Sequence, residues 1–174
     1  MTMTKIMLDL ETMGTRPNSA IIAIGAVRFD NEAILDRFHT VIDLESCLRA
    51  GLEVDGDTVN WWMKQSDAAR AVFQTPGVEL PQALTDFATW LLTVRTTEVW
   101  GDGAGFDNVL LTNAYQKCNY LPPWPFYTDR CYRTVKAMNP DITSDGRIGV
   151  YHNSQDDTET QALHLIKILK VLTK

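Results

Sequence analysis

An apolar run close to the N-terminus places the strongest restriction on the fold, because two carboxylates interrupt it: Lys5-Ile6-Met7-Leu8-Asp9-Leu10-Glu11-Thr12. An extended strand points side chains i and i+2 to the same face, so Asp9 and Glu11 lie on one side, about 7 Å apart. Two like charges on a core strand are costly unless a positive group lies between them. No Lys or Arg alternates with these acids, so the run indicates a divalent cation held by hard oxygen ligands. The alternative is a strand at a partly exposed sheet edge.

The composition is that of an ordinary globular protein, and it limits the classes of function. The 174 residues are 45% hydrophobic and 22% charged, so we expect residues 1–174 to form a single domain with a full core. No apolar run approaches the roughly 18 residues of a transmembrane helix, so no membrane partner is expected. The formal net charge of −6 argues against nonspecific coating of DNA, although a carboxylate metal site itself contributes negative charge.

The cysteines and the N-terminus indicate a reducing compartment. Cys47, Cys118 and Cys131 are odd in number and form no C-x-x-C pair. They fit free thiols, and zinc is not expected. Residues 1–4 lead into the first strand without a signal peptide, so we expect a cytoplasmic location.

Apolar periodicity and turn residues predict an α/β fold. Strands are expected over residues 5–12, 20–29 and 38–42 as an antiparallel meander, with a short strand over residues 98–100. Helices are expected over residues 58 to about 65, 67–73, 80–92, 106–118 and 128–138, with Asp57 and Ser66 as N-caps of the first two. A capping box from Ser154 to Asp157 opens a last helix. Strands followed by helices indicate a mixed central sheet flanked by helices.

Two further carboxylates lie where folding alone does not require them. Asp107 follows a Gly-rich turn between a strand and a helix, and Asp157 lies in the first turn of the last helix, five residues after His152. A helix N-terminus favours an anion by about 0.3–1 kcal/mol, which is the bland explanation for each acid alone. Taken in order with the first pair and with His152, the set favours a shared cation site. Asp156 competes for the last position, but its spacing from His152 favours Asp157, leaving Asp156 as a solvated charge.

These residues carry a resemblance to a known family. Asp9-Leu10-Glu11-Thr12 resembles the first motif of the DEDD exonucleases (DnaQ-like, RNase T-like), and Gly105-Phe106-Asp107-Asn108 resembles the second. His152-x4-Asp157 matches the third motif in its His-bearing DEDDh form. The ordered set of five residues is far more specific than D-x-E alone. Two further segments, Trp100-Gly101-x-Gly103 and Thr58-Val59-x-Trp61-Trp62, are similar to the RNase AS-like and phage exonuclease branch.

The resemblance implies an RNase H-like fold and a metal-dependent 3′–5′ exonuclease that hydrolyses single-stranded RNA or DNA to 5′-mononucleotides. Two Mg²⁺ ions, for which Mn²⁺ can substitute, would flank the scissile phosphate. Asp9 would bridge both ions. Glu11 and Asp157 would complete the water-activating site, and Asp107 would support the other ion. His152 would take the proton from the attacking water, since an imidazole with an ordinary pKa near 6.5 suits a base at neutral pH.

Other residues are candidates for contact with the 3′-terminal nucleotide. The resemblance implies that backbone groups of Thr12, Met13 and Gly14 approach this nucleotide, although Gly14 also fits a simple turn. Trp61 and Trp62 are neighbours on a helix and cannot both face the same core. One of them is therefore a candidate for stacking on a base, and packing is the alternative.

Phe106 and Arg130 complete the candidate substrate contacts. Phe106 precedes the second-motif Asp, and packing in the core is its alternative role. Arg130 and Arg133 fall three residues apart on the expected helix over residues 128–138. Their side chains could hold phosphates or pair with nearby acids.

Several alternatives stay open from the sequence. A binding module that kept the fold and lost its activity is the rival from another class, and a structural Ca²⁺ site is disfavoured because the acids do not share one loop. The choice between RNA and DNA depends on a group that meets the 2′-hydroxyl, which the sequence does not locate. A homodimer is a hypothesis, because a chain with limited positive surface would bind its substrate better if a partner subunit added binding surface.

Overall fold

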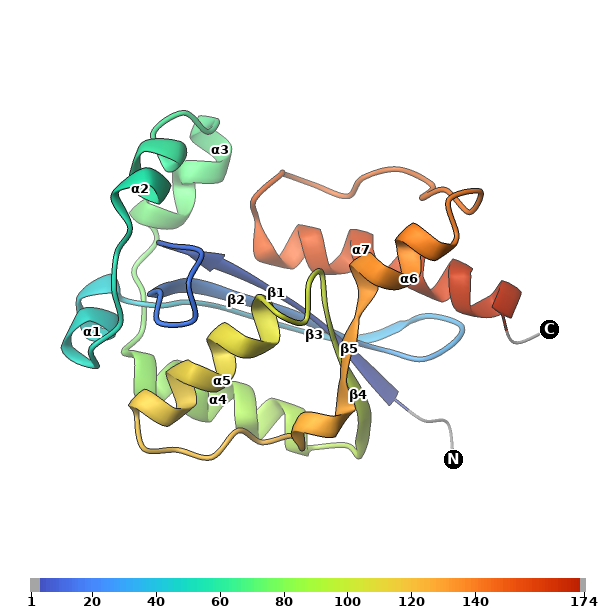
Figure 1. The fold of residues 1–174 in the computed structure, drawn as a ribbon, viewed down its shortest axis with the longest axis horizontal. Helices are drawn as coiled ribbons and strands as arrows, with labels where there is room; N and C mark the ends of the chain where they lie inside the picture. Colours follow the sequence, from blue (N-terminus) through green and yellow to red (C-terminus); the bar gives the residue numbers. More distant parts are fainter. Residues whose placement is uncertain (1–3, 173–174) are drawn as a thin grey trace.

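The fold is built on one mixed sheet of five strands. The computed structural model describes residues 4–172, and the strand order is β3-β2-β1-β4-β5 (Figure 1). The strands β1 (Thr4–Thr12), β2 (Ile21–Phe29) and β3 (Ile34–Val41) pair antiparallel, whereas β1, β4 (Thr96–Gly101) and β5 (Asp129–Cys131) pair parallel. The predicted meander and mixed sheet are therefore confirmed.

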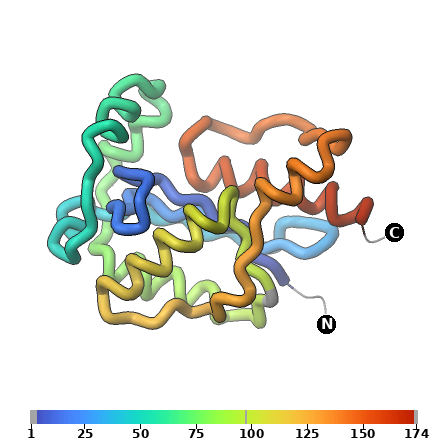
Figure 2. The backbone as a smooth tube through the Cα atoms, viewed as in Figure 1, coloured from blue at the N-terminus to red at the C-terminus, as the bar shows by residue number. Residues whose placement is uncertain are grey.

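Helices cover both faces of this sheet. They are α1 (Leu44–Arg49), α2 (Gly56–Trp62), α3 (Asp67–Arg70), α4 (Leu80–Leu92), α5 (Asp107–Lys117), α6 (Tyr132–Met138) and α7 (Ser154–Leu172), with 3-10 turns η1 (Ala71–Gln74) and η2 (Phe126–Thr128). The helices α4 and α5 lie on one face, and α6 and α7 lie on the other (Figures 1 and 2). Their apolar side chains belong to two separate clusters, one on each face. Within residues 4–172, each helix is too short or too polar to cross a membrane.

The side chains of β1 alternate between the two helix layers. Leu8 and Leu10 are buried in the large cluster with α4 and α5, whereas Met7 is buried in the smaller cluster with α7. Because the strand period is two, Asp9 and Glu11 continue the face of Met7. The two acids therefore point toward the layer that holds α7.

A close approach between α7 and β2 determines where α7 begins. In the register of β1 and β2, Asp9 lies opposite Gly25. A Cβ atom added at Gly25 would stand 2.2 Å from the carbonyl oxygen of Ser154, so a side chain there would collide with backbone. The absence of a side chain at Gly25 lets the first turn of α7 lie on the sheet beside Asp9.

The N-cap of α7 differs from the expectation. The side-chain oxygen of Asn153, not that of Ser154, accepts hydrogen bonds from the backbone N–H groups of Gln155 and Asp156, at 3.1 and 3.2 Å. Ser154 is 1% exposed, and its hydroxyl has no hydrogen-bond partner among the described residues. The expected capping box is wrong because the Ser154 backbone packs against Gly25 and its side chain is buried.

The expected helix over residues 128–138 is wrong in its first part. Residues 126–128 form η2, residues 129–131 form β5, and α6 begins only at Tyr132. The short strand pairs with the end of β4, where Arg130 lies opposite Trp100. This pairing is a contact between distant segments, so local helical periodicity did not reveal it.

Smaller differences concern the ends of elements. Asp55 caps α2 in place of the expected Asp57, accepting a hydrogen bond from the Asp57 N–H at 3.0 Å, whereas Ser66 caps α3 as predicted. The expected helix over residues 67–73 changes to a 3-10 turn after residue 70, and β3 starts at residue 34 instead of 38. The short helix α1 was not expected.

We expect Gly25→Ala to lower the free energy of unfolding by about 1–3 kcal/mol, because overpacking against rigid backbone forces α7 away from β2. Urea denaturation monitored by tryptophan fluorescence measures this change. Gly56→Ala is the matched control, since a Cβ atom there meets nothing within 4 Å. Equal stability of Gly25→Ala and the wild type would contradict the proposed close packing.

Candidate active site

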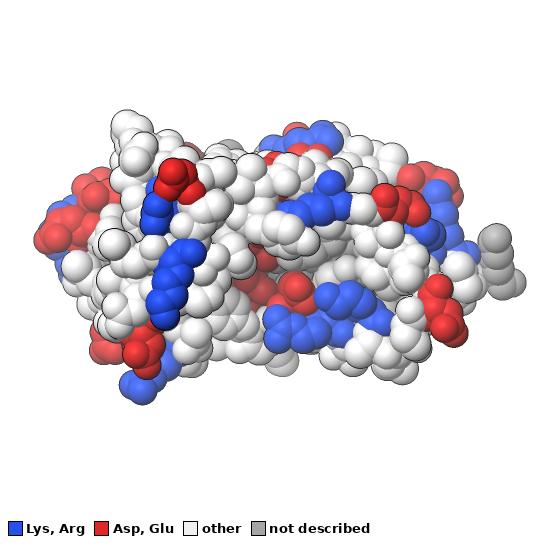
Figure 3. Space-filling model, turned by 90° about the horizontal axis from the view of Figure 1, so that it is seen from above, with Lys and Arg blue, Asp and Glu red and all other residues white. Residues whose placement is uncertain are grey.

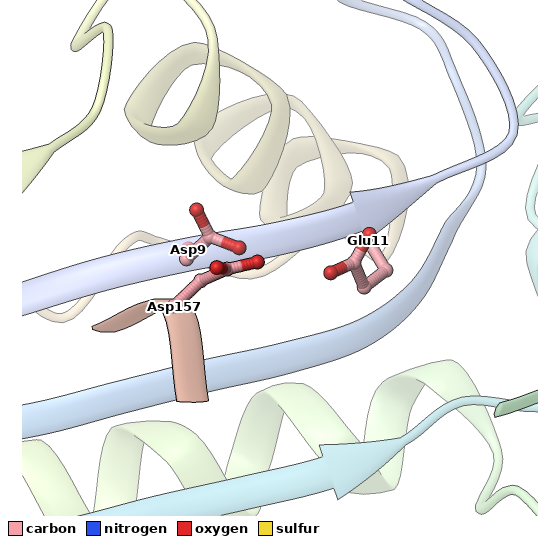
Figure 4. Close-up of side chains that lie close together, drawn as sticks. All are labelled: Asp9, Glu11 and Asp157. Atoms are coloured by element: carbon pink, nitrogen blue, oxygen red, sulfur yellow. The ribbon is translucent and has the colours of Figure 1, made fainter. Parts of the chain in front are cut away.

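Three carboxylates from the two ends of the chain meet at one point. Asp9 and Glu11 come from β1, and Asp157 comes from the first turn of α7. One carboxylate oxygen from each lies within 4.8 Å of the others, and Figure 4 shows the three side chains converging. Of the candidate ligands from the sequence, these three form the tight group.

The electrostatic setting of this group favours a bound cation. Glu11 is 6% exposed, and its Oε1 atom has no hydrogen-bond partner among the described residues. Burial, and then the charges of Asp157 and Asp107, raise the pKa of Glu11 to about 8. Burial is also the largest cause of a pKa for Asp9 well above its usual value, and the charges of Asp107 and Glu11 add to it. Among the described residues, Arg147 is the basic group paired with this cluster, so the carboxylates outnumber the positive charges, and hard divalent cations would supply the difference.

Asp107 lies behind this group, at the start of α5. It is 3% exposed, and its Oδ1 atom accepts a hydrogen bond from the backbone N–H of Leu10 at 3.2 Å. A Cβ atom added at Gly101 would stand 3.1 Å from the Asp107 Cβ atom. The absence of a side chain at the end of β4 therefore leaves room for the Asp107 side chain. Burial raises the pKa of Asp107 to about 7. The carboxylate is close enough to raise the pKa of Asp9, but the 4.8 Å group does not include it.

Asp157 and Asp156 have different partners. Asp157 Oδ1 forms an ion pair with Arg147 Nη1 at 2.5 Å, and Asp157 Oδ2 accepts a hydrogen bond from the His152 N–H at 3.1 Å. Burial raises the pKa of Asp157, and the hydrogen bond and charge of Arg147 oppose this shift. Asp156 instead accepts a hydrogen bond from the Val150 N–H at 2.7 Å. The expectation that Asp156 is merely solvated is therefore wrong, since its carboxylate is hydrogen-bonded to the loop that precedes α7.

His152 stands at the rim of the acidic group. Its φ of 62° is unusual for a residue with a side chain. The imidazole packs edge-on against Trp61, with 4.7 Å between ring centroids, and lies 6.3 Å from the Trp62 ring. The bond from its backbone to Asp157 and the contact with α2 hold the ring between these two elements.

A large cavity joins these groups. Its volume is about 910 Å³, and its lining includes the three carboxylates of the tight group, His152, aromatic residues and three basic residues. Seen from above, acidic side chains lie in a hollow and basic side chains gather along one edge (Figure 3). A cavity that combines buried acids, an imidazole and basic side chains has the chemistry needed to hold divalent cations and a phosphate group.

The sequence profile of one family matches almost the whole described chain. This family is described as the 3′-5′ exoribonuclease Rv2179c-like domain, and the match runs from residue 4 to residue 169. The chain belongs to this family. It is therefore a 3′–5′ exonuclease, which confirms the activity that the DEDDh resemblance implied.

Solved structures share the fold of this exonuclease at low sequence identity. The nuclease domain of 3'hExo, a DEDDh family member bound to rAMP, gives a TM-score of 0.66 at 15% identity, covering 98% of this chain and 93% of that one. Cell-death related nuclease 4 (CRN-4) gives 0.65 at 15% identity, with coverages of 97% and 64%. E. coli Exonuclease I in complex with a 5cy-dT13 oligonucleotide gives 0.66 at 15% identity, with coverages of 99% and 41%.

The exonuclease thus spans much less than two thirds of the length of Exonuclease I. Among curated proteins, none is significantly similar to it in sequence. The structural neighbours confirm the predicted RNase H-like fold of the DEDDh exonucleases.

The candidate substrate contacts of the first motif are only partly open to the cavity. Thr12 and Gly14 line it, and the Thr12 hydroxyl donates a hydrogen bond to the Gly14 carbonyl at 2.7 Å. Met13 is buried in the core, its N–H donates to Ala20 and its carbonyl accepts from Asp55. The backbone polar groups of Met13 are thus already paired within the exonuclease.

The two adjacent tryptophans have different environments. Trp62 is 3% exposed, and its indole N–H donates a hydrogen bond to the Thr12 carbonyl at 2.9 Å. Trp61 is 41% exposed, and both residues line the cavity. Of the two, Trp61 offers the more accessible ring to a base.

Phe106 and Arg130 lie in different places. Phe106 lines the cavity while its ring packs against the large apolar cluster. Arg130 lies on β5, where it donates hydrogen bonds to the Tyr127 and Asp129 carbonyls and approaches Glu98 at 3.6 Å. It does not belong to the cavity lining, so the structure does not bring it to the carboxylates.

Two residues beside the carboxylates were not identified from the sequence. Gln161 donates a hydrogen bond from Nε2 to Asp9 Oδ1 at 3.0 Å, and this bond opposes the raised pKa of Asp9. Its position four residues after Asp157 places it on the same helix face, which is a signal that was available. Arg147 lies in an irregular loop, where no periodicity marked it.

In the presence of EDTA, we expect the exonuclease to lose stability as the pH rises from about 4.5 to about 8. Burial raises the pKa of Glu11 from 4.5 to about 8, so the folded state retains a proton that the unfolded chain releases in this window. Glu11→Gln should therefore flatten the profile. It should also raise the free energy of unfolding at pH 8 by at least about 1 kcal/mol, since one pKa unit corresponds to about 1.4 kcal/mol.

Urea unfolding at several pH values between these limits measures the profile. Asp141→Asn, which removes an exposed carboxylate, is the control and should follow the wild type. A wild-type stability that stays constant or rises across the window would show that the cluster is not strained by its charge.

Proposed function

We propose that this exonuclease hydrolyses single-stranded nucleic acid from a free 3′ end to 5′-mononucleotides, with two Mg²⁺ ions held by its carboxylates. The observation that supports this most is the convergence of Asp9, Glu11 and Asp157 within 4.8 Å. Asp107 lies behind them and His152 stands at the rim. Residues 1–174 would act as one catalytic domain.

The donor set fits hard divalent cations, and Mn²⁺ is expected to substitute for Mg²⁺. Asp9 would contact both ions. Glu11 and Asp157 would complete the site that faces the attacking water, and Asp107 would support the other. When bound, the ions lower the pKa of water and stabilise negative charge on the leaving oxygen.

Side chains of the protein would take the proton of the attacking water and position the 3′ end of the strand. A ring nitrogen of His152 accepts the proton of the attacking water. The water oxygen bonds to phosphorus while the bond from phosphorus to the 3′-oxygen breaks. The terminal nucleotide leaves with a 5′-phosphate, and the shortened strand regains a 3′-hydroxyl when its oxygen is protonated. Trp61 packs against the imidazole and helps to fix its orientation.

RNA is the proposed preferred strand, because the family is described as exoribonucleases. E. coli Exonuclease I, which shares the fold, was solved with dT13 and dA16 oligonucleotides. The fold itself therefore does not exclude DNA, and discrimination requires a contact with the 2′-hydroxyl.

A cytoplasmic location and a homodimer remain predictions. Cys47, Cys118 and Cys131 are free thiols, as a reducing compartment requires. A partner subunit would add surface for gripping a strand, which is the reason to expect a dimer.

We expect Asp9→Asn to abolish Mg²⁺-dependent digestion of 5′-labelled single strands while the circular dichroism spectrum stays unchanged. His152→Ala should lower kcat by about 10²–10⁴-fold, the usual contribution of a general base. Matched RNA and DNA oligonucleotides, with Mg²⁺, Mn²⁺ or EDTA, measure activity, metal dependence and strand preference together. Asp86→Asn and His39→Ala are the controls, since both residues lie outside the cavity lining. A wild type that binds strands without cutting them would support an inactive binding module instead.

We expect Trp61→Ala to raise KM by an amount equivalent to about 1–3 kcal/mol, because it removes an exposed ring on which a base can stack. Steady-state kinetics on a single-stranded oligonucleotide measure the change. Phe126→Ala removes an aromatic ring that is 83% exposed but not part of the cavity lining, so it should leave KM unchanged. If both variants keep the wild-type KM, Trp61 serves packing against His152 only.

A further inference from the structure

One wall of the cavity carries two cations that the proposed reaction does not use. Arg133 and Lys136 lie three residues apart on α6, and both line the cavity that holds the carboxylates. Residues i and i+3 share a helix face, so both basic groups border the same path out of the cavity.

Arg133 is held in place yet remains open to solvent. Its Nη2 atom donates a hydrogen bond to the Asp102 carbonyl at 2.6 Å, and its Nε atom lies 3.4 Å from the Asp102 carboxylate. Its guanidinium lies against Gly103, where an added Cβ atom would stand 3.5 Å from the Arg133 Cζ atom. The side chain is 67% exposed. The guanidinium is therefore fixed beside the turn that leads to Asp107, with donors left for a ligand.

Lys136 is also held, but by an aromatic ring. Its ammonium lies 4.8 Å from the centroid of the Tyr132 ring, and it has no acidic partner within the described residues 4–172. The Tyr132 hydroxyl is bonded to His164 Nδ1 at 2.7 Å, and His164 Nε2 is bonded to the Ile142 carbonyl at 2.6 Å. Because a carbonyl oxygen can only accept, His164 Nε2 donates the hydrogen bond to Ile142. The hydrogen bond to buried His164 therefore holds the Tyr132 ring in position beneath Lys136.

The third basic residue of the cavity has another partner. Arg147 is paired with Asp157 and is half-buried. Arg130, which the sequence analysis considered together with Arg133, is outside the cavity and near Glu98. Arg133 and Lys136 are therefore the basic groups of the lining that remain available to an anionic ligand.

We propose that Arg133 and Lys136 form a phosphate-binding ledge for the strand on the 5′ side of the scissile phosphate. The proposal rests on the proposed function, because the carboxylate group fixes where the scissile phosphate lies and α6 is the basic wall beside it. The ledge contacts the sugar-phosphate backbone, so it serves RNA and DNA alike and reads no base. It gives affinity to strands long enough to reach α6, and little to a dinucleotide.

Salt dependence measures the ledge directly. Each phosphate contact on a single strand contributes about −0.7 to the slope of log affinity against log salt concentration, so the loss of two contacts changes the slope by about 1.4. Between about 50 and 200 mM salt, the wild type should lose about sevenfold more affinity than Arg133→Ala/Lys136→Ala. Fluorescence anisotropy with a strand of about 12 nucleotides, in an Asp9→Asn background with Mg²⁺, measures binding without cleavage.

Kinetics and matched variants complete the test. In the active enzyme, the double substitution should raise KM for the long strand much more than for a dinucleotide, and Arg133→Lys/Lys136→Arg should restore the wild-type salt slope. Arg49→Ala/Lys117→Ala removes two charges outside the cavity lining and should keep the wild-type slope. An unchanged slope in the ledge variant, or an equal change in this control, would overturn the ledge. A wild type without exonuclease activity would overturn the proposed function, while the binding measurement would still decide the ledge.

Discussion

The packing of α7 on Gly25 is the contact on which the site depends. Gly25 lies opposite Asp9 in the sheet, and the missing side chain admits the Ser154 backbone. One turn of helix later, Asp157 reaches the face of β1 that carries Asp9 and Glu11. Without that close approach, the acids from the two ends of the chain would not meet in one group.

The same arrangement is electrostatically unfavourable for the fold on its own. Burial and the charges of neighbouring acids raise the pKa of both Asp9 and Glu11, and the Glu11 Oε1 atom has no hydrogen-bond partner among the described residues. The opposite face of β1 compensates, since Leu8 and Leu10 are buried in the large apolar cluster with α4 and α5. The apolar burial on one face of β1 thus offsets the cost of the strained acids on the other face, and perturbed acids of this kind are common at functional sites.

The sequence allowed the acids to be identified because their signals are local. A period of two placed Asp9 and Glu11 on one face, and the spacing from His152 selected Asp157, which the structure places in the tight group. The predictions that were wrong concern contacts between distant segments. The helix expected to begin at residue 128 starts instead with β5, which exists only through its pairing with β4, and the capping box was displaced by the burial of Ser154.

The antiparallel meander, the larger helices, the three acids that the structure brings together and the class of exonuclease followed from periodicity, spacing and motif, which are local features of the chain. Tertiary structure decided which basic residues line the cavity, since it includes Arg133 but not Arg130 of the pair considered from the sequence and adds Lys136 and Arg147. It also brought Gln161 to Asp9 across 152 residues of chain. The physical reason is that strand register and helix packing determine these distances, and neither can be read from a local pattern.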